Sequence, residues 1–311
     1  MKLFRILPCR LKAKTQDFGS WNIRSIRVRA TNVLIMNEKK ILILTMSCNI
    51  PYFQALLGVV KDTWAKPLVH NKYKNVTWFA YTACNEKHPK PHIDFEEHII
   101  YVDCPDDLHH TYEKTQKAYN MIKDVIDFDY VLRTNTSVFV NVDKTIERIC
   151  STGVDDVMGR CTRYYHRNQE GGYDFVSYIV IGFFMGMKRE YFDIMMSAHN
   201  EYNVNKYGEI IPSNDDVIMS MKLFEELGTI NNVAINEGDI CPAYKVYIPG
   251  SEPETIKELP KKDFFFEPDF INDYTMARVR SLYRDEDSNT MMRSTIGHEI
   301  EHMYELYNAL K

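Results

Sequence analysis

The chain has 311 residues, of which 45% are apolar and 26% charged, and its formal net charge is −5 at pH 7. This composition is that of a folded globular protein with one large core or two modest ones, and it excludes a disordered or fibrous chain. Seven cysteines without a C-x-x-C pair argue against a disulfide framework or a cysteine zinc site. No apolar run in the sequence reaches the roughly 20 residues of a membrane span, and the start MKLFRILPCRLKAK makes a poor signal peptide. The sequence therefore predicts a soluble, cytoplasmic protein.

Residues 1–38 are predicted to form a basic arm. The first forty residues carry ten Lys and Arg against two acidic residues, so the remainder of the chain is acidic. Such an arm can touch an anionic membrane surface or nucleic acid, or it can stay solvated or dock on the acidic remainder. We favour the solvated or docked arm, keep peripheral membrane contact as the alternative, and predict no nucleic-acid partner.

From Lys39 onward, strand-like and helix-like patterns alternate. The run KKILILTM, residues 39–46, is typical of a strand covered on both faces, and a segment with helical spacing follows it. Repeated β-α-β units predict an α/β fold, with an open, mostly parallel sheet and helices on both faces. Such a sheet binds ligands beyond the carboxyl ends of its strands. Further strands are predicted at residues 76–83, 97–104, 128–135, 155–160 and 174–187, and further helices at 110–126, 142–150, 215–227 and 295–310.

Two phosphate-binding motifs are absent from the sequence. No G-x-G-x-x-G follows the first predicted strand, and no G-x-x-x-x-G-K-[ST] occurs. A dinucleotide-binding fold or a P-loop phosphotransferase would therefore lack its usual phosphate cradle, and an anionic ligand would need other groups.

A literal H-E-x-x-H motif lies near the end of the chain, where His298 to His302 read HEIEH. On a helix this spacing places two imidazoles on one face for zinc, with the glutamate beside them as a general base. A third zinc ligand is expected downstream, but the nine residues after His302 hold no histidine, and their sole carboxylate is Glu305. We favour an exposed charged face on a terminal helix and keep a zinc metallopeptidase as the alternative.

Five motifs occur in this order along the chain: VKDTW (60–64), DDLHHTYEKT (106–115), YVLRTNTSVFVN (130–141), YIVIGFFMGMKREYF (178–192) and NDDVIMS (214–220). The ordered set resembles the β1,3-galactosyltransferase and Fringe-like family of nucleotide-sugar glycosyltransferases, which have the GT-A fold. The corresponding family patterns are I-R-x-T-W, D-x-Y-x-N-L-x-x-K-T, Y-x-L-K-T-D-D-D-V-F-V-N, a glycine-containing strand and an acidic helix start. The resemblance implies a Rossmann-like GT-A catalytic domain over residues 39–245, with C-terminal loops and a helix at 246–311 packing on it.

The same resemblance implies an inverting transfer of a hexose from a nucleotide sugar, in our interpretation a uridine diphosphate (UDP) sugar, to a saccharide hydroxyl. Such a reaction needs a carboxylate that deprotonates the acceptor hydroxyl. Asp216 aligns with the family's catalytic aspartate, and Asp215 is the second candidate. Adjacent carboxylates raise each other's pKa when partly buried, which suits a base. The alternative interpretation is a helix cap, because aspartate favours that position.

The family's acidic triplet is replaced in this chain by Asn135, Thr136 and Ser137. In the family the triplet holds a divalent metal, because hard cations such as Mn²⁺ or Mg²⁺ want carboxylate oxygens. Three alternatives stay open: a metal-independent site in which Lys or Arg replaces the cation, a metal held by other carboxylates, and a catalytically silent module that binds a sugar nucleotide or glycan.

The remaining candidates are expected to bind the donor. Side chains after the first strand and near the end of the third strand are candidates for the base and ribose, and basic residues are candidates for the diphosphate. The first group is Thr45, Ser47, Asn49, Asp103 and Asp106, and the second is Lys61, Arg133, Arg280 and Arg284.

Overall fold

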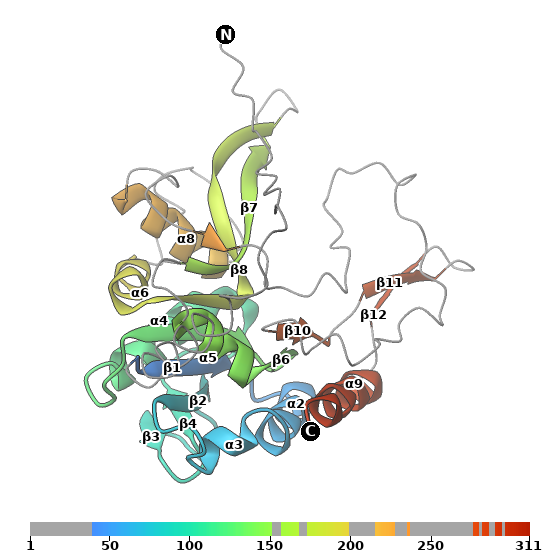
Figure 1. Ribbon diagram of the computed structural model, residues 1–311. Helices are drawn as coiled ribbons and strands as arrows, with labels where there is room; N and C mark the ends of the chain where they lie inside the picture. The colour runs from blue at the N-terminus through green and yellow to red at the C-terminus, as the bar shows by residue number, and fades with distance from the viewer. Residues whose placement is uncertain are drawn as a thin grey trace, which may run out of the picture.

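The computed structural model describes residues 39–150, 157–167, 173–198, 215–227, 235–236, 276–279, 282–285, 290–293 and 296–311. The predicted basic arm, residues 1–38, lies outside this described part. Figure 1 shows the elements gathered around a central sheet. Within the described ranges, no helix is both long enough and apolar enough to cross a membrane.

The central sheet has eight strands: β1 (Ile41–Met46), β2 (Val76–Ala83), β3 (His92–Asp94), β4 (Ile99–Val102), β5 (Tyr130–Asn135), β7 (Val157–Arg167), β8 (Tyr173–Lys188) and β9 (Ile235–Asn236). Their order is β3-β4-β2-β1-β5-β8-β7-β9. Strands β4, β2, β1 and β5 pair in parallel, as do β7 and β9, whereas β3 and β8 run against their neighbours. The predicted mostly parallel α/β sheet is confirmed.

Strands β7 and β8 depart from the β-α-β pattern. They pair antiparallel from Val157↔Met187 to Arg167↔Tyr173, and Figure 1 shows them rising together from the sheet. Only residues 168–172 separate them, whereas a parallel crossover needs roughly a dozen residues or more. The short connection therefore requires β8 to run antiparallel to β7, and β8 also pairs antiparallel with β5 on its other side.

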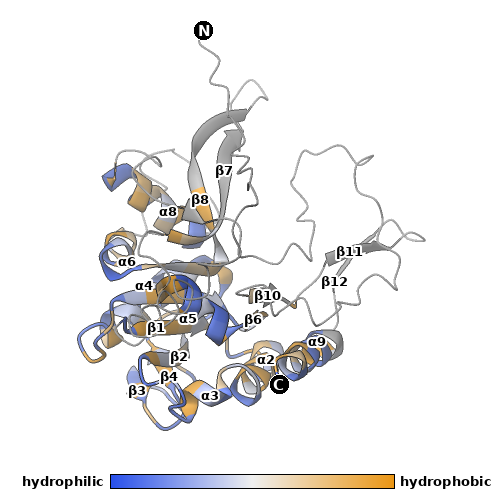
Figure 2. Ribbon diagram, viewed as in Figure 1, coloured by the Kyte–Doolittle hydropathy of each residue, from blue (hydrophilic) through white to orange (hydrophobic). Residues whose placement is uncertain are grey.

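Helices cover both faces of the sheet. One apolar cluster joins alternate strand residues such as Ile41 and Ile43 to α2 (Pro51–Asp62), α3 (Lys66–Val69), α5 (Val142–Cys150) and α9 (Ile296–Ala309). The other joins Leu42 and Leu44 to α4 (Thr111–Ile122), α6 (Arg189–Met196) and α8 (Asp215–Glu226). Figure 2 shows both apolar and polar residues on α2 and α9, as expected of helices that cover a sheet. The alternation buries both faces of β1, as its continuous apolar run predicts.

C-terminal segments return to the sheet domain. Strand β10 (Met276–Arg278) pairs antiparallel with β6 (Val138–Val140), and Val279 N–H donates to Ser137 O at 2.9 Å. Helix α9 packs against α2, and its Met303 and Leu306 join the same apolar cluster. Strands β11 (Leu282–Asp285) and β12 (Thr290–Arg293) form a separate antiparallel pair. The chain after residue 275 thus contributes side chains to the core of the domain.

Replacing Leu306 by alanine should lower the free energy of unfolding by about 2–5 kcal/mol, because a fully buried side chain leaves a cavity. Leu310→Ala, one residue past the end of α9, is the control: Leu310 is 36% exposed, and its truncation should change stability by about 0.5 kcal/mol or less. Urea denaturation of both variants measures the difference. Equal, small effects would mean that α9 does not pack on the domain in solution.

Candidate functional site

The candidate site lies where the carboxyl ends of β1 and β5 meet. The chain leaves β1 toward β2 on one side and returns through β5 on the other side, so the two following loops diverge. Met46 and Asn135 are register partners at these ends, and Thr136 N–H donates to Met46 O at 3.2 Å. Open α/β sheets bind ligands at such a topological switch point.

Two buried hydroxyls mark this switch point. Within the described part of the chain, Ser47 Oγ and Thr136 Oγ1 are buried without a hydrogen-bond partner. A buried polar group that lacks a partner costs about 1–3 kcal/mol. The structure thus brings these two predicted donor-binding residues together, with free hydrogen-bonding capacity for a polar ligand.

Asn135 and Ser137 form a local turn. Asn135 Oδ1 accepts hydrogen bonds from Ser137 N–H at 3.1 Å and from Ser137 Oγ at 2.8 Å. The amide oxygen is therefore already engaged, in the manner of an Asx turn. None of residues 135–137 is anionic, and the described residues contain no group of three or more His, Cys, Asp or Glu that could hold a metal. The neutral oxygen atoms of this loop do not form the carboxylate ligand set that a hard divalent cation prefers.

Arg133 lies fully buried directly below this loop. Its guanidinium forms an ion pair with Asp215, and its Nε donates to Tyr81 Oη at 3.3 Å. Burial alone would lower the pKa of Arg133, but the Asp215 carboxylate and Tyr81 outweigh that effect and raise it. The charge of this predicted donor-binding residue is already balanced inside the protein.

Asp216 sits beside that pair, at the start of α8. Its Oδ2 accepts from Gly182 N–H of β8 at 3.1 Å, and its Oδ1 accepts from Val217 N–H at 3.0 Å. Burial, followed by repulsion from Asp215, raises the pKa of Asp216 to about 6. A carboxylate with such a pKa is mostly ionised at pH 7 and is still basic enough to accept a proton. Asp216 thus joins the helix start to the sheet and has the properties of a general base.

Gly182 permits this close approach of β8 to the charges. A Cβ at this position would lie 2.8 Å from Arg133 Nη1 and 3.0 Å from Asp216 Cβ. Any side chain would therefore displace the guanidinium or the carboxylate.

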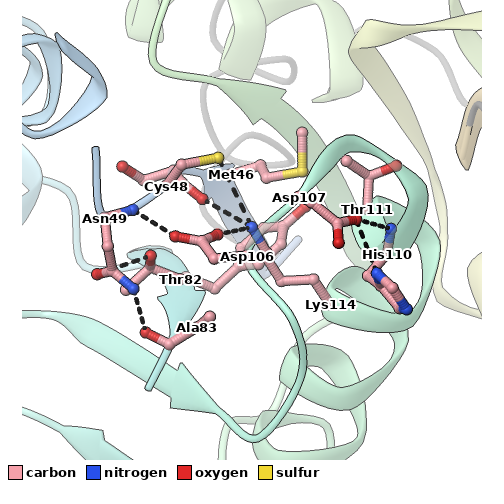
Figure 3. A network of polar contacts seen from close by, with 12 residues as sticks. Met46, Cys48, Asn49, Thr82, Ala83, Asp106, Asp107, His110, Thr111 and Lys114 are labelled. Carbon is pink, nitrogen blue, oxygen red and sulfur yellow. Dashed lines mark hydrogen bonds and ion pairs between the residues drawn. The ribbon is translucent and has the colours of Figure 1, made fainter. Parts of the chain in front are cut away.

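A second buried ion pair ties together the loops after β1 and β4 (Figure 3). Lys114 of α4 is fully buried and pairs with Asp106, and its Nζ also lies 3.4 Å from Ser47 O and 3.6 Å from Cys48 Sγ. Asn49 N–H donates to the other oxygen of Asp106 at 2.5 Å. Asp106 therefore holds two loops, and both of its oxygens are occupied. Sequence reasoning missed Lys114 as a site residue, although it is the lysine of the motif DDLHHTYEKT.

Other predicted donor-binding residues near this edge have structural partners or face solvent. Thr45 Oγ1 accepts from Trp78 Nε1 at 2.9 Å, within the core. The Asn49 side chain donates to Ala83 O at 3.0 Å. Asp103 is exposed, and its carbonyl accepts from Lys117.

Of three further predicted cations, one lies away from the switch point and the side chains of the other two lie outside the described part of the chain. Lys61 lies in the last turn of α2 and forms an ion pair with Glu97 at 2.8 Å. Because Glu97 comes just before β4, this pair lies at the amino ends of the parallel strands, opposite the switch point. Arg280 lies outside the described residues. Arg284 belongs to β11, but its side chain also lies outside the described part.

The HEIEH segment is helical, but the expected exposed charged face is wrong for two of its residues. Glu299 is fully buried and accepts from Tyr52 Oη of α2, and His302 is also buried. The side chain of His298 lies outside the described part. Because Glu299 lies between α2 and α9 and is bonded to Tyr52, it is not presented to solvent as the base of a zinc peptidase would be.

No protein-family model matches the chain, and no curated protein matches its sequence. Among solved structures 92 chains match. One is 2-C-methyl-D-erythritol 4-phosphate cytidylyltransferase (IspD) of Francisella tularensis, at 13% identity and a TM-score of 0.35, covering 64% of this chain and 89% of that one. Another is the glycosyltransferase GlyE of Streptococcus pneumoniae, at 15% identity and a TM-score of 0.31, covering 64% of this chain and 45% of that one. At these TM-scores the fold assignment rests on the strand order of the chain itself, and membership of the Fringe-like family is not shown.

Replacing Arg133 by methionine should lower the free energy of unfolding by about 3–5 kcal/mol, because Asp215 is then left as a buried charge without its partner. The double variant Arg133→Met/Asp215→Leu should lose less than the sum of the single variants. Chemical denaturation of the four proteins in this cycle measures the coupling. Lys144→Met, which breaks an exposed pair with Glu147, is the control and should have little effect. Additive losses would contradict a direct interaction.

Proposed function

We propose that the protein is a glycosyltransferase that moves a hexose from a nucleotide sugar, a UDP sugar in the first instance, to a saccharide hydroxyl with inversion. The observation that carries this proposal is Asp216, a half-buried carboxylate whose pKa is raised to about 6, and whose two oxygens accept from Gly182 N–H and Val217 N–H beside the switch point of a mostly parallel sheet. The motif order from Val60 to Ser220 supports the same reaction class.

In the proposed reaction Asp216 accepts the proton of the acceptor hydroxyl. The hydroxyl oxygen forms a bond to the anomeric carbon as the bond from that carbon to the diphosphate oxygen breaks, and the nucleoside diphosphate leaves. Ser47 Oγ and Thr136 Oγ1 are the proposed hydrogen-bonding partners of the donor. General base catalysis of this kind contributes typically about 10²–10⁴-fold to the rate.

We further propose that the transfer does not depend on a metal. The neutral turn at Asn135 and Ser137 supports this, because its amide oxygen is engaged and no carboxylate lies within residues 135–137. Arg133 and Lys114 are already paired with carboxylates. Arg280 is the proposed diphosphate cation, because Val279 N–H bonds to Ser137 O and Arg280 is the next residue along the chain.

Asp216→Asn should reduce transfer by about 10²–10⁴-fold and leave donor binding intact, because only the proton acceptor is lost. Turnover is measured as release of nucleoside diphosphate from a panel of nucleotide sugars with saccharide acceptors. Asp193→Asn is the matched control, because it makes the same chemical change at a carboxylate elsewhere in the fold. Asp193 lies on α6 and accepts from Tyr119 Oη at 2.8 Å. Full activity of Asp216→Asn would remove Asp216 as the base.

Isothermal titration with UDP should give the same affinity in excess EDTA as in Mn²⁺ or Mg²⁺, because the loop at residues 135–137 offers only neutral oxygens. Arg280→Met should weaken binding in both conditions, whereas Lys61→Met should not, because Lys61 lies at the opposite edge. Binding only with a divalent cation would contradict the metal-independent proposal.

A catalytically silent module that binds a sugar nucleotide or glycan is the second candidate, because the acidic triplet is replaced by Asn135, Thr136 and Ser137. The two experiments above separate the candidates. UDP binding together with turnover supports the transferase, and UDP binding without turnover on any acceptor supports the silent module.

A further inference from the structure

We propose that Arg133 and Asp215 are a positioning pair that holds the base Asp216 in place, so that Asp215 is not a second base and Arg133 is not a cation for the diphosphate. This inference rests on the proposed function in assigning Asp216 as the base. The pair is assigned from the contacts that Arg133 makes at the carboxyl edge of the sheet.

Arg133 connects four elements that meet beside Asp216. Its guanidinium lies 3.4 Å from Met46 Sδ of β1, bonds to Tyr81 of β2 and pairs with Asp215 of α8. Gly182 of β8 lies against the same guanidinium, and its N–H bonds to Asp216. Two adjacent carboxylates therefore fix the start of α8 to the sheet: Asp215 pairs with the guanidinium of Arg133, and Asp216 accepts from the backbone N–H of Gly182.

The orientation of the guanidinium is itself fixed by a chain of hydrogen bonds. Tyr81 Oη accepts from Arg133 Nε and lies 2.9 Å from Thr115 Oγ1. Because Thr115 Oγ1 donates to Thr111 O at 2.8 Å, its oxygen is left to accept from Tyr81. An arginine can bond to Tyr81 with Nε and to Asp215 with Nη2 at the same time, whereas a lysine offers one point charge.

The pair also sets the charge balance around Asp216. Burial raises the pKa of Asp216 most. Of the charged groups, Asp215 on its own helix also raises this pKa and Arg133 from β5 lowers it, as the N–H groups of Gly182 and Val217 do. Tyr81 of β2 accepts a hydrogen bond from Arg133. Loss of Arg133 should therefore raise the pKa of Asp216, and loss of the Asp215 charge should lower it. If Arg133 and Asp215 had merely structural roles, their separate loss would not shift the pKa of Asp216 in opposite directions.

The experiment is a carbon NMR titration of protein labelled at the aspartate carboxyl carbon, with the Asp216 signal identified from its absence in Asp216→Asn. Arg133→Met should raise the midpoint and Asp215→Asn should lower it, each by about one pH unit or more. The double variant Arg133→Met/Asp215→Asn should return toward the wild-type midpoint, and Asp193→Asn is the control that should leave it unchanged. Unchanged midpoints, or shifts of the same sign in both single variants, would overturn the proposal.

Arg133→Lys covers the case in which Arg133→Met does not fold. Lysine keeps the positive charge but cannot bond to Tyr81 and Asp215 with separate N–H groups as the guanidinium does. The titration midpoint of Asp216 should therefore stay near the wild-type value, while kcat falls about ten-fold or more and KM for the donor is unchanged. Tyr81→Phe should likewise lower kcat without moving donor KM. Wild-type kcat in both variants would overturn the positioning role.

The titration does not depend on turnover, so the two proposals fail separately. Opposite midpoint shifts in a protein that transfers no sugar would support the effect of the pair on Asp216 and remove the proposed function. Turnover that depends on Asp216 with midpoints insensitive to Arg133 and Asp215 would keep the proposed function and remove the pair.

Discussion

The buried ion pair between Arg133 and Asp215 is the interaction on which the carboxyl edge of the sheet depends. It joins β5 to the start of α8, and the bond from Arg133 to Tyr81 extends it to β2. A buried ion pair adds little net stability compared with apolar packing, although breaking one is costly. Its presence is therefore better explained by the geometry that it fixes at Asp216 than by a contribution to stability.

Charge at this edge is balanced within the protein. Two buried cations, Arg133 and Lys114, each face a carboxylate on another element, while the turn at Asn135 is neutral. The first pair fixes the helix that carries the proposed base, and the second fixes the loops after β1 and β4. The edge is thus organised without an external charge, which is consistent with the proposal that a metal is not required there.

The sheet and the start of α8 at Asp215 were predictable because their signals are local: apolar runs mark strands, and an acidic pair opens a helix. The position of Lys61 was not predictable from the sequence. It depends on the length and direction of α2, whose last turn places Lys61 beside Glu97 at the amino ends of the strands. The burial of Lys114 was not predictable either, since lysine is rarely buried unless paired and its partner Asp106 belongs to a loop. Glu299 was expected on an exposed face, but the motif HEIEH does not show which side of α9 meets α2.

The raised pKa of Asp216 implies that the site reduces the stability of the fold. Its carboxyl titrates at about 6 when folded, above the ordinary value of 3.8, so the folded protein holds a proton more tightly than the unfolded chain. The tighter proton binding stabilises the folded protein fully when the pH lies below the pKa of Asp216 in the unfolded chain. This stabilisation is lost as the pH rises through the pKa of the folded protein, and the loss is on the order of 3 kcal/mol at neutral pH. Arg133 and the N–H groups of Gly182 and Val217 oppose the shift and limit this loss. The contacts that hold the Asp216 side chain therefore also keep a half-buried, ionised carboxylate compatible with folding.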